Sequence, residues 1–165
     1  MPISAHIFEV HARHQNDDKN YKGVDMKDYD ISIGFILINS KNRFLVMQKA
    51  VDGVWDFPKG HVKPNDDNEI ATAIRELAEE TGISANDLKL VEGFRNVNTY
   101  INPEKIHRKI ILFLALCDAK PVLSPEHTTY QWADLEKAKK LLRFKGGQDA
   151  VTRAYRFLQK QSKDN

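Results

Sequence analysis

The stretch NEIATAIRELAEETGI, residues 68–83, decides how this chain folds. Its apolar residues recur at i, i+3, i+4 and i+7, the spacing of one helix face: Ile70, Ala73, Ile74 and Leu77. Gly82 follows them, as is typical of a helix C-cap. Candidate caps for the first turn precede them: Asp66, Asp67 and Asn68. The pattern predicts an amphipathic helix over residues 68–81.

Three carboxylates crowd one flank of this helix, beside the apolar stripe. Glu76 and Glu80 are one turn apart, and Glu79 lies next to them, one turn from Arg75. Taken alone, a charge run of this kind is usually a solvated face. The alternative is a site for a hard divalent cation, because carboxylate oxygens and substrate phosphates together bind Mg²⁺.

The residues around the helix favour the cation. Gly60, an acidic residue near position 67 and residues 75–83 resemble the Nudix box, G-x5-E-x7-R-E-U-x-E-E-x-G-U, where U is aliphatic. The second half of the box matches at each specified position. Asp67 keeps the seven-residue gap to the arginine, but it is not glutamate, and six residues separate it from the glycine. Asp66 and Glu69 are the alternatives for this acidic position.

The resemblance implies an α+β fold, a mixed β-sheet sandwiched between helices (α/β/α), and a Mg²⁺-dependent hydrolase, with Mn²⁺ as the alternative metal. It implies that Glu76, Glu79 and Glu80 are metal ligands, together with the backbone carbonyl of Gly60. Glu76 is also a candidate general base, and Arg75 would orient the glutamates. The metals would neutralise a polyphosphate, polarise the attacked P–O bond and lower the pKa of a bound water.

Segments outside the box are similar to one group within the family, the asymmetric diadenosine tetraphosphate hydrolases. They are WDFPKGHV at 55–62, VEGF at 91–94, LSPEHTTYQW at 123–132, and ADLEKA at 133–138 followed by Phe144. The resemblance implies asymmetric cleavage of the dinucleotide to ATP and AMP, by attack of water at phosphorus. Two rival functions stay open, an RNA 5′-triphosphate pyrophosphohydrolase and a catalytically silent domain that binds a nucleotide.

The same resemblance extends the predicted site beyond the helix. Glu126, in the loop sequence SPEH, would be a remote ligand or base, whereas His127 is as well explained by packing. The predicted catalytic residues are therefore Arg75, Glu76, Glu79 and Glu126, and Glu126 joins the metal ligands. Basic candidates for holding phosphates are Lys59, His61, Arg108, Lys109 and Lys145. Aromatic candidates for sandwiching adenine are Tyr100 and Phe144.

The rest of the chain indicates a single domain of alternating strands and few helices. Its 165 residues are 41% hydrophobic, and the net charge of +2 is too small to indicate extensive nucleic-acid binding. Predicted strands cover residues 31–37, 43–48, 55–58, 88–100, 109–116 and 130–133. Predicted helices cover 134–142 and 148–159, separated by Lys-Gly-Gly at 145–147. This interleaving predicts a mixed sheet with helices on its faces.

Residues 1–30 are expected to be an extension, an extra strand at residues 5–12 followed by a polar loop, and residues 31–160 the hydrolase domain. The single cysteine, Cys117, stands in an apolar run and is expected to be a buried, inert thiol. There is no signal-like N-terminus and no apolar run long enough for a membrane helix. We therefore expect a cytoplasmic protein without membrane contact, a monomer or a homodimer.

Overall fold

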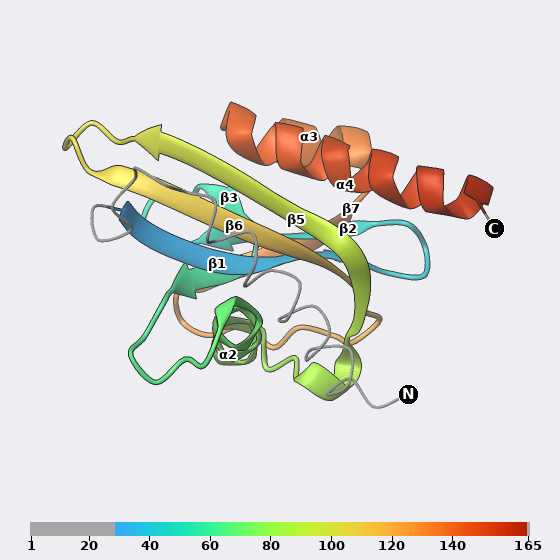
Figure 1. Cartoon of the computed structure of the whole chain (residues 1–165), viewed down its shortest axis with the longest axis horizontal. Coiled ribbons are helices and arrows are strands. Elements are labelled where there is room, and N and C mark those ends of the chain that lie inside the picture. Colours follow the sequence, from blue (N-terminus) through green and yellow to red (C-terminus); the bar gives the residue numbers. More distant parts are fainter. Residues whose placement is uncertain (1–28, 165) are drawn as a thin grey trace.

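The computed structural model describes residues 29–164 of the chain. The strand predicted at residues 5–12 lies outside the described residues. Within them, helices flank a seven-stranded mixed sheet, α2 on one side and α3 with α4 on the other (Figure 1). The predicted α+β architecture is therefore confirmed. No helix in the described range is both long and apolar enough to cross a membrane.

The strands run in the order β3-β2-β1-β6-β5, with β4 paired to β1 and β7 paired to β2. Their bounds are β1 Tyr29–Ile38, β2 Phe44–Lys49, β3 Trp55–Asp56, β4 Lys59–His61, β5 Lys89–Ile101, β6 His107–Leu116 and β7 His127–Ala133. Helix α2 is Glu69–Thr81, α3 is Leu135–Leu141 and α4 is Lys145–Asp164, and a short 3-10 turn covers Ala85–Asp87. The first two strands, β1 and β2, pair antiparallel.

The central pair, β1 and β6, is parallel and divides the core in two. Ile33 and Ile111 are partners whose side chains pack in the layer under α2. Ile36 and Leu114 are partners whose side chains pack in the layer under α3 and α4. Because successive side chains point to opposite faces of a strand, odd and even positions here serve different layers. On β1 and β6, an odd or even residue number therefore tells which side of the sheet a side chain faces.

Helix α2 begins and ends where its sequence predicts. Of the three candidate caps, Asn68 is the one that caps the first turn, because its side-chain oxygen accepts from the Ala71 amide at 2.8 Å. At the other end Gly82 adopts the left-handed conformation, φ 68°, and donates to the carbonyl of Ala78. The helix that carries the glutamates is therefore fixed at both ends by local chemistry.

Two elements differ from the expectation. Helix α4 begins at Lys145 rather than at 148, so the two glycines lie in its first turn instead of in a linker. A Cβ on Gly146 would come within 2.2 Å of the Asn98 side-chain amide, so the glycine allows the helix to pack closely on β5. Strand β4 was not predicted at all, because three residues are too few to show a period. It pairs with β1 and carries Gly60.

Candidate active site

The three helix glutamates and the remote glutamate line one pocket of about 290 Å³. Its walls are Glu76, Glu79, Glu80, Ser124, Pro125 and Glu126. The first three come from the second half of α2, and the others come from the loop that leads into β7. Two segments more than 40 positions apart in the sequence thus converge, as the sequence predicts.

Backbone hydrogen bonds tie that loop to the end of α2. The Ser124 amide donates to the carbonyl of Glu80 at 3.0 Å, and the Val122 amide donates to the carbonyl of Thr81 at 2.8 Å. These carbonyls belong to the last turn, where backbone carbonyls have no N–H donor within the helix itself. The loop therefore completes the helix end and, in doing so, places Glu126 beside Glu80.

Gly60 faces the helix from strand β4. It is the partner of Ile33, whose side chain lies under α2. A Cβ at this position would be 2.1 Å from the carboxylate of Glu76, a distance that no side chain tolerates. Glycine thus permits the close approach of the β4 backbone to Glu76 that the predicted metal site requires.

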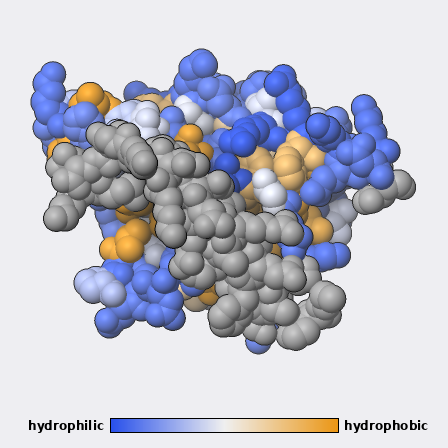
Figure 2. Space-filling model, viewed as in Figure 1, coloured by the Kyte–Doolittle hydropathy of each residue, from blue (hydrophilic) through white to orange (hydrophobic). Residues whose placement is uncertain are grey.

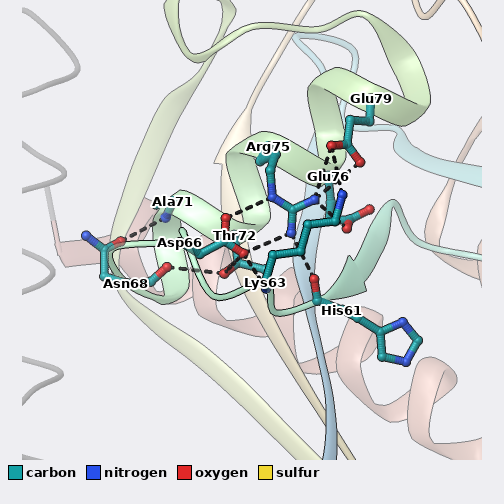
Figure 3. A network of polar contacts seen from close by, with 9 residues as sticks. All are labelled: His61, Lys63, Asp66, Asn68, Ala71, Thr72, Arg75, Glu76 and Glu79. Atoms are coloured by element: carbon teal, nitrogen blue, oxygen red, sulfur yellow. Dashed lines mark hydrogen bonds and ion pairs between the residues drawn. The ribbon is translucent and has the colours of Figure 1, made fainter.

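Arg75 holds a network of carboxylates along the flank of α2 (Figure 3). Its Nη1 donates to Glu76 Oε1 at 2.8 Å and to Glu79 Oε1 at 3.2 Å. Its Nε and Nη2 donate to the two oxygens of Asp66 at 2.8 and 2.9 Å, and Nη2 also donates to the His61 carbonyl at 2.8 Å. A guanidinium donates to several acceptors in a fixed plane, so Arg75 can orient both glutamates at once.

Asp66 is the acidic residue that pairs with this arginine. It also accepts from the Lys63 amide at 2.8 Å and from the Thr72 hydroxyl at 2.9 Å. Hydrogen bonds from the guanidinium of Arg75, the main cause, hold the pKa of the Asp66 carboxyl far below its usual range.

The two alternatives for this position point elsewhere. Asp67, which keeps the seven-residue gap of the box, is exposed, and Glu69 binds Arg95 of β5 at 2.7 Å. The contacts therefore favour Asp66 over Asp67 for the acidic position of the box, and five residues separate Asp66 from Gly60, as the box requires. The extra residue falls between Asp66 and Arg75, at the start of the helix.

Glu80 has an environment opposite to that of Asp66. Its side chain is 6% exposed, and its Oε2 accepts from the Lys59 amide at 3.2 Å. Burial, reinforced by the nearby Glu76, raises the pKa of Glu80 to about 8. The Lys59 ammonium does not compensate fully, because it pairs with Asp56 at 2.7 Å. The donor set of this pocket is therefore crowded, hard and short of positive charge, which fits a divalent cation.

Several predicted phosphate-binding residues share the sheet face that points away from α2. Register places Lys59 opposite Gly34 and His61 opposite Ser32, both even positions of β1. Arg108 pairs with Asp30, another even position. Three basic side chains thus lie on one face, two of them on β4, the strand that carries Gly60, and one on β6.

Asp30 joins two of these side chains and was not predicted. Its Oδ1 lies 2.9 Å from His61 Nε2, and its Oδ2 lies 2.7 Å from Arg108 Nη1. Sequence reasoning assigned it to the end of the N-terminal extension, whereas the structure places it in β1. Its even number on β1 places it on the sheet face away from α2, and this was the only signal in the sequence that could have indicated its position.

Lys109 does not lie with the other basic candidates. It follows Arg108 on β6 and so points to the opposite face, where it is 3% exposed. Its partners in the ladders are Ile31 and Thr99. The structure therefore separates Lys109 from the surface that carries Lys59, His61 and Arg108, which the sequence alone did not anticipate.

The two aromatic candidates lie at the β5 edge of the same sheet face. Tyr100 is the partner of Arg108 and is 44% exposed. Phe144 directly precedes α4 and is 63% exposed, and the first turn of α4 packs against Asn98, two residues before Tyr100 on β5. Lys145 is exposed and pairs with Asp149 at 3.2 Å. Both rings are therefore accessible to a ligand at the rim of the sheet.

His127 is the residue of this region that sequence reasoning left undecided. One ligand atom each from Glu80, Glu126 and His127 lie within 4.8 Å of one another. Burial lowers the pKa of the His127 imidazole, and its Nδ1 has no hydrogen-bond partner. Its position directly after Glu126 could have suggested proximity to the metal site, but a neighbour on a strand normally points away.

Comparison with known proteins adds family evidence to this geometry. The family model described as NUDIX domain matches residues 28–155. The chain is 41% identical over 125 residues to the mouse bis(5′-nucleosyl)-tetraphosphatase [asymmetrical], covering 73% of this chain and 83% of that protein. It is 31% identical over 99 residues to an RNA pyrophosphohydrolase of Pasteurella multocida, covering 60% of this chain and 46% of that one. A crystal structure of a C. elegans Ap4A hydrolase binary complex superposes with a TM-score of 0.73 at 27% identity, covering 78% of this chain and 97% of that one.

Proposed function

The chain belongs to the Nudix family, and from this premise we propose that it hydrolyses diadenosine tetraphosphate asymmetrically, to ATP and AMP, with Mg²⁺ as the metal. Mn²⁺ is the alternative. The main support for this substrate is the 41% identity to the mouse tetraphosphatase, in an alignment that covers 83% of that protein. The pocket of four glutamates beside a basic sheet face supports the chemistry.

The proposed metal ligands are the helix glutamates, the remote glutamate and one backbone carbonyl: Glu76, Glu79, Glu80, Glu126 and Gly60. When bound, a divalent cation supplies charge neutralisation for the polyphosphate and activates water toward phosphorus. Arg75 positions Glu76 and Glu79 through its hydrogen bonds, and Glu76 is the proposed general base. Each of these roles is a proposal that the contacts support.

Substrate binding is proposed for the face of the sheet that points away from α2. Lys59, His61 and Arg108 would hold adjacent phosphates while a single phosphorus is attacked. Tyr100 and Phe144, both exposed, would stack on one adenine ring, which gives affinity without close reading of the base. A grip on one nucleoside at one end of the chain of phosphates favours attack away from its centre, and hence unequal products.

The test is product analysis in ¹⁸O-labelled water. Diadenosine tetraphosphate is incubated with the protein and Mg²⁺, and nucleotides are separated by chromatography. Equal amounts of ATP and AMP, with the label in one of the two products, are expected, whereas two ADP or no cleavage would contradict the proposal. The matched control is Glu79→Gln, which keeps side-chain size but removes a proposed ligand charge and should lower turnover.

An RNA 5′-triphosphate pyrophosphohydrolase is the second candidate. It is favoured by the 31% identity to the Pasteurella enzyme, although the chain covers less than half of that protein. A comparison of kcat/KM on a panel of dinucleotides, triphosphorylated RNA and nucleotide sugars separates the two. A larger value for RNA, with release of pyrophosphate, would favour this candidate. A catalytically silent domain would bind the nucleotides without any metal-dependent turnover.

Two further properties remain proposals. A cytoplasmic location agrees with the single cysteine, Cys117, which is 3% exposed and buried in the core as predicted. The state of assembly is proposed to be a monomer or a homodimer. Sedimentation of the full chain and fractionation of cells address them separately.

A further inference from the structure

His127 is turned toward the metal pocket by an irregularity in the sheet. Strand β7 pairs with β2 in register up to Thr129, which lies opposite Gln48, but Lys49 then lies opposite His127. Thr128 is therefore the extra residue of a β-bulge, a feature that re-aims side chains next to functional sites. Without the bulge, Lys49 would face Thr128, and His127 would project from the other side of the sheet.

The imidazole has an unused ligand atom. His127 is 9% exposed, and its Nδ1 is buried without a hydrogen-bond partner. The described residues contain only three such buried side-chain atoms, and a second one, the Ser124 hydroxyl, belongs to the same loop. Leaving a buried polar atom unpaired is unfavourable, so two of them within four residues indicate a partner from outside the chain.

The position of this imidazole defines the partner. One of its ring nitrogens and one carboxylate oxygen each from Glu80 and Glu126 lie within 4.8 Å of one another, a span that one cation can bridge. We propose that His127 is a metal ligand, so that the cation between the end of α2 and this loop is held by one imidazole and two carboxylates. The inference rests on the proposed function only in requiring a divalent cation in this pocket.

A nitrogen ligand changes which cation the pocket prefers. Mg²⁺ binds almost entirely through oxygen, whereas imidazole suits transition metals such as Mn²⁺, Co²⁺ and Zn²⁺. A site with Glu80, Glu126 and His127 should therefore favour these cations over Mg²⁺. The carboxylate-only remainder of the pocket, with Glu76 and Glu79, keeps the oxygen environment that suits Mg²⁺.

The test is electron spin echo spectroscopy of the full, untagged chain loaded with one equivalent of Mn²⁺ and no nucleotide. Directly bound imidazole is expected to give ¹⁴N modulation, which changes to the ¹⁵N pattern when histidine is labelled. Absence of nitrogen coupling in this wild-type sample overturns the inference without any variant. His127→Asn should remove the coupling, and His61→Asn, which changes another histidine near the site, should leave it in place.

Metal affinity gives the second readout. Competition titrations with His127→Asn should show Zn²⁺ and Mn²⁺ affinities lowered about tenfold or more, while Mg²⁺ affinity stays nearly the same. A parallel loss for all three metals would mean that His127 only orients Glu126, and would overturn the inference. If nitrogen coupling is present but the dinucleotide is not cleaved, the ligand assignment stands and the proposed function fails.

Discussion

The two ends of helix α2 use carboxylates in opposite ways. At the start, Asp66 and Glu69 each bind an arginine, and Asn68 caps the first turn. At the end, Glu80 is buried beside Glu126 with no arginine partner among the described contacts. On the face drawn in Figure 2, hydrophilic residues predominate among those coloured by hydropathy, with smaller hydrophobic groups between them.

The difference separates a carboxylate that stabilises the fold from one that is available to bind a cation. Pairing with Arg75 lowers the pKa of Asp66, so this carboxylate carries a fixed charge that is already neutralised. Burial raises the pKa of Glu80 to about 8, so its charge is costly until something positive arrives. Asp66 before the helix therefore stabilises the fold, whereas Glu80 at its end is, in our proposal, held for a cation.

The largest effect is expected from Glu80→Gln. The substitution removes a proposed ligand charge, so kcat should fall about 10³-fold. It also removes a buried charge, so the metal-free protein at pH 9 should become more stable in urea unfolding. Steady-state kinetics with Mg²⁺ and unfolding in a chelator measure the two parts. A loss of stability in the metal-free protein would contradict the assignment of this end of the helix.

Asp66→Asn should act in the opposite way on stability. It leaves the Arg75 guanidinium without its main acceptor, so the free energy of unfolding should fall by about 2 kcal/mol. Because Arg75 also orients Glu76 and Glu79, kcat should fall about tenfold. Urea unfolding and kinetics at pH 7 measure both. Unchanged stability would show that another carboxylate supports the arginine.

The metal-free protein should lose stability as the pH rises through neutrality. Glu80 keeps its proton in the folded state up to about pH 8, whereas in the unfolded chain it loses it near 4.5. The folded state thus binds more protons between these values, and the free energy of unfolding falls with pH, by about 1 kcal/mol between pH 7 and 8. Asp66 adds no slope there, since its contribution is complete above the unfolded value of 3.8 and is lost only in acid.

Urea unfolding in chelator across pH 5 to 9 measures this slope. The matched variant is Glu80→Gln, in which the part due to Glu80 should vanish. An identical slope in the variant would assign the effect to another group.

The smallest effect is expected from Asp67→Asn. This residue is exposed, so its replacement should change the free energy of unfolding by less than about 0.5 kcal/mol and leave kcat unchanged. The same measurements as for Asp66→Asn provide the direct comparison between neighbours. A larger effect at Asp67 than at Asp66 would reverse the assignment of the acidic position in the box.

The sequence predicts the helix and the placement of its glutamates along one flank because both depend on local rules. Periodicity and capping fix α2 to within a residue, and the spacing of Glu76, Glu79 and Glu80 follows from the helix itself. The choice between Asp66 and Asp67 does not follow from any local rule. Both are acidic, and only the path of the loop from β4 decides which one reaches Arg75.

Strand parity explains the remaining differences. Arg108 and Lys109 look equivalent as cations in the sequence, yet alternation sends them to opposite faces of the sheet. Which of them lies on the face proposed to bind substrate cannot be seen before the sheet is assembled. The same holds for Asp30, whose two basic partners come from β4 and β6. His127 shows the converse, because a bulge overrides the parity that the sequence would suggest.

The bonds from the loop amides to the last carbonyls of α2 also determine how the site can come apart. Because Ser124 and Val122 complete the final turn, this turn cannot fray without releasing the loop. Helix end and loop should therefore open as one cooperative unit, in which Glu80 and Glu126 part together. Hydrogen exchange at those two amides would then count the openings of the whole site, and a bound cation would slow both by the same factor.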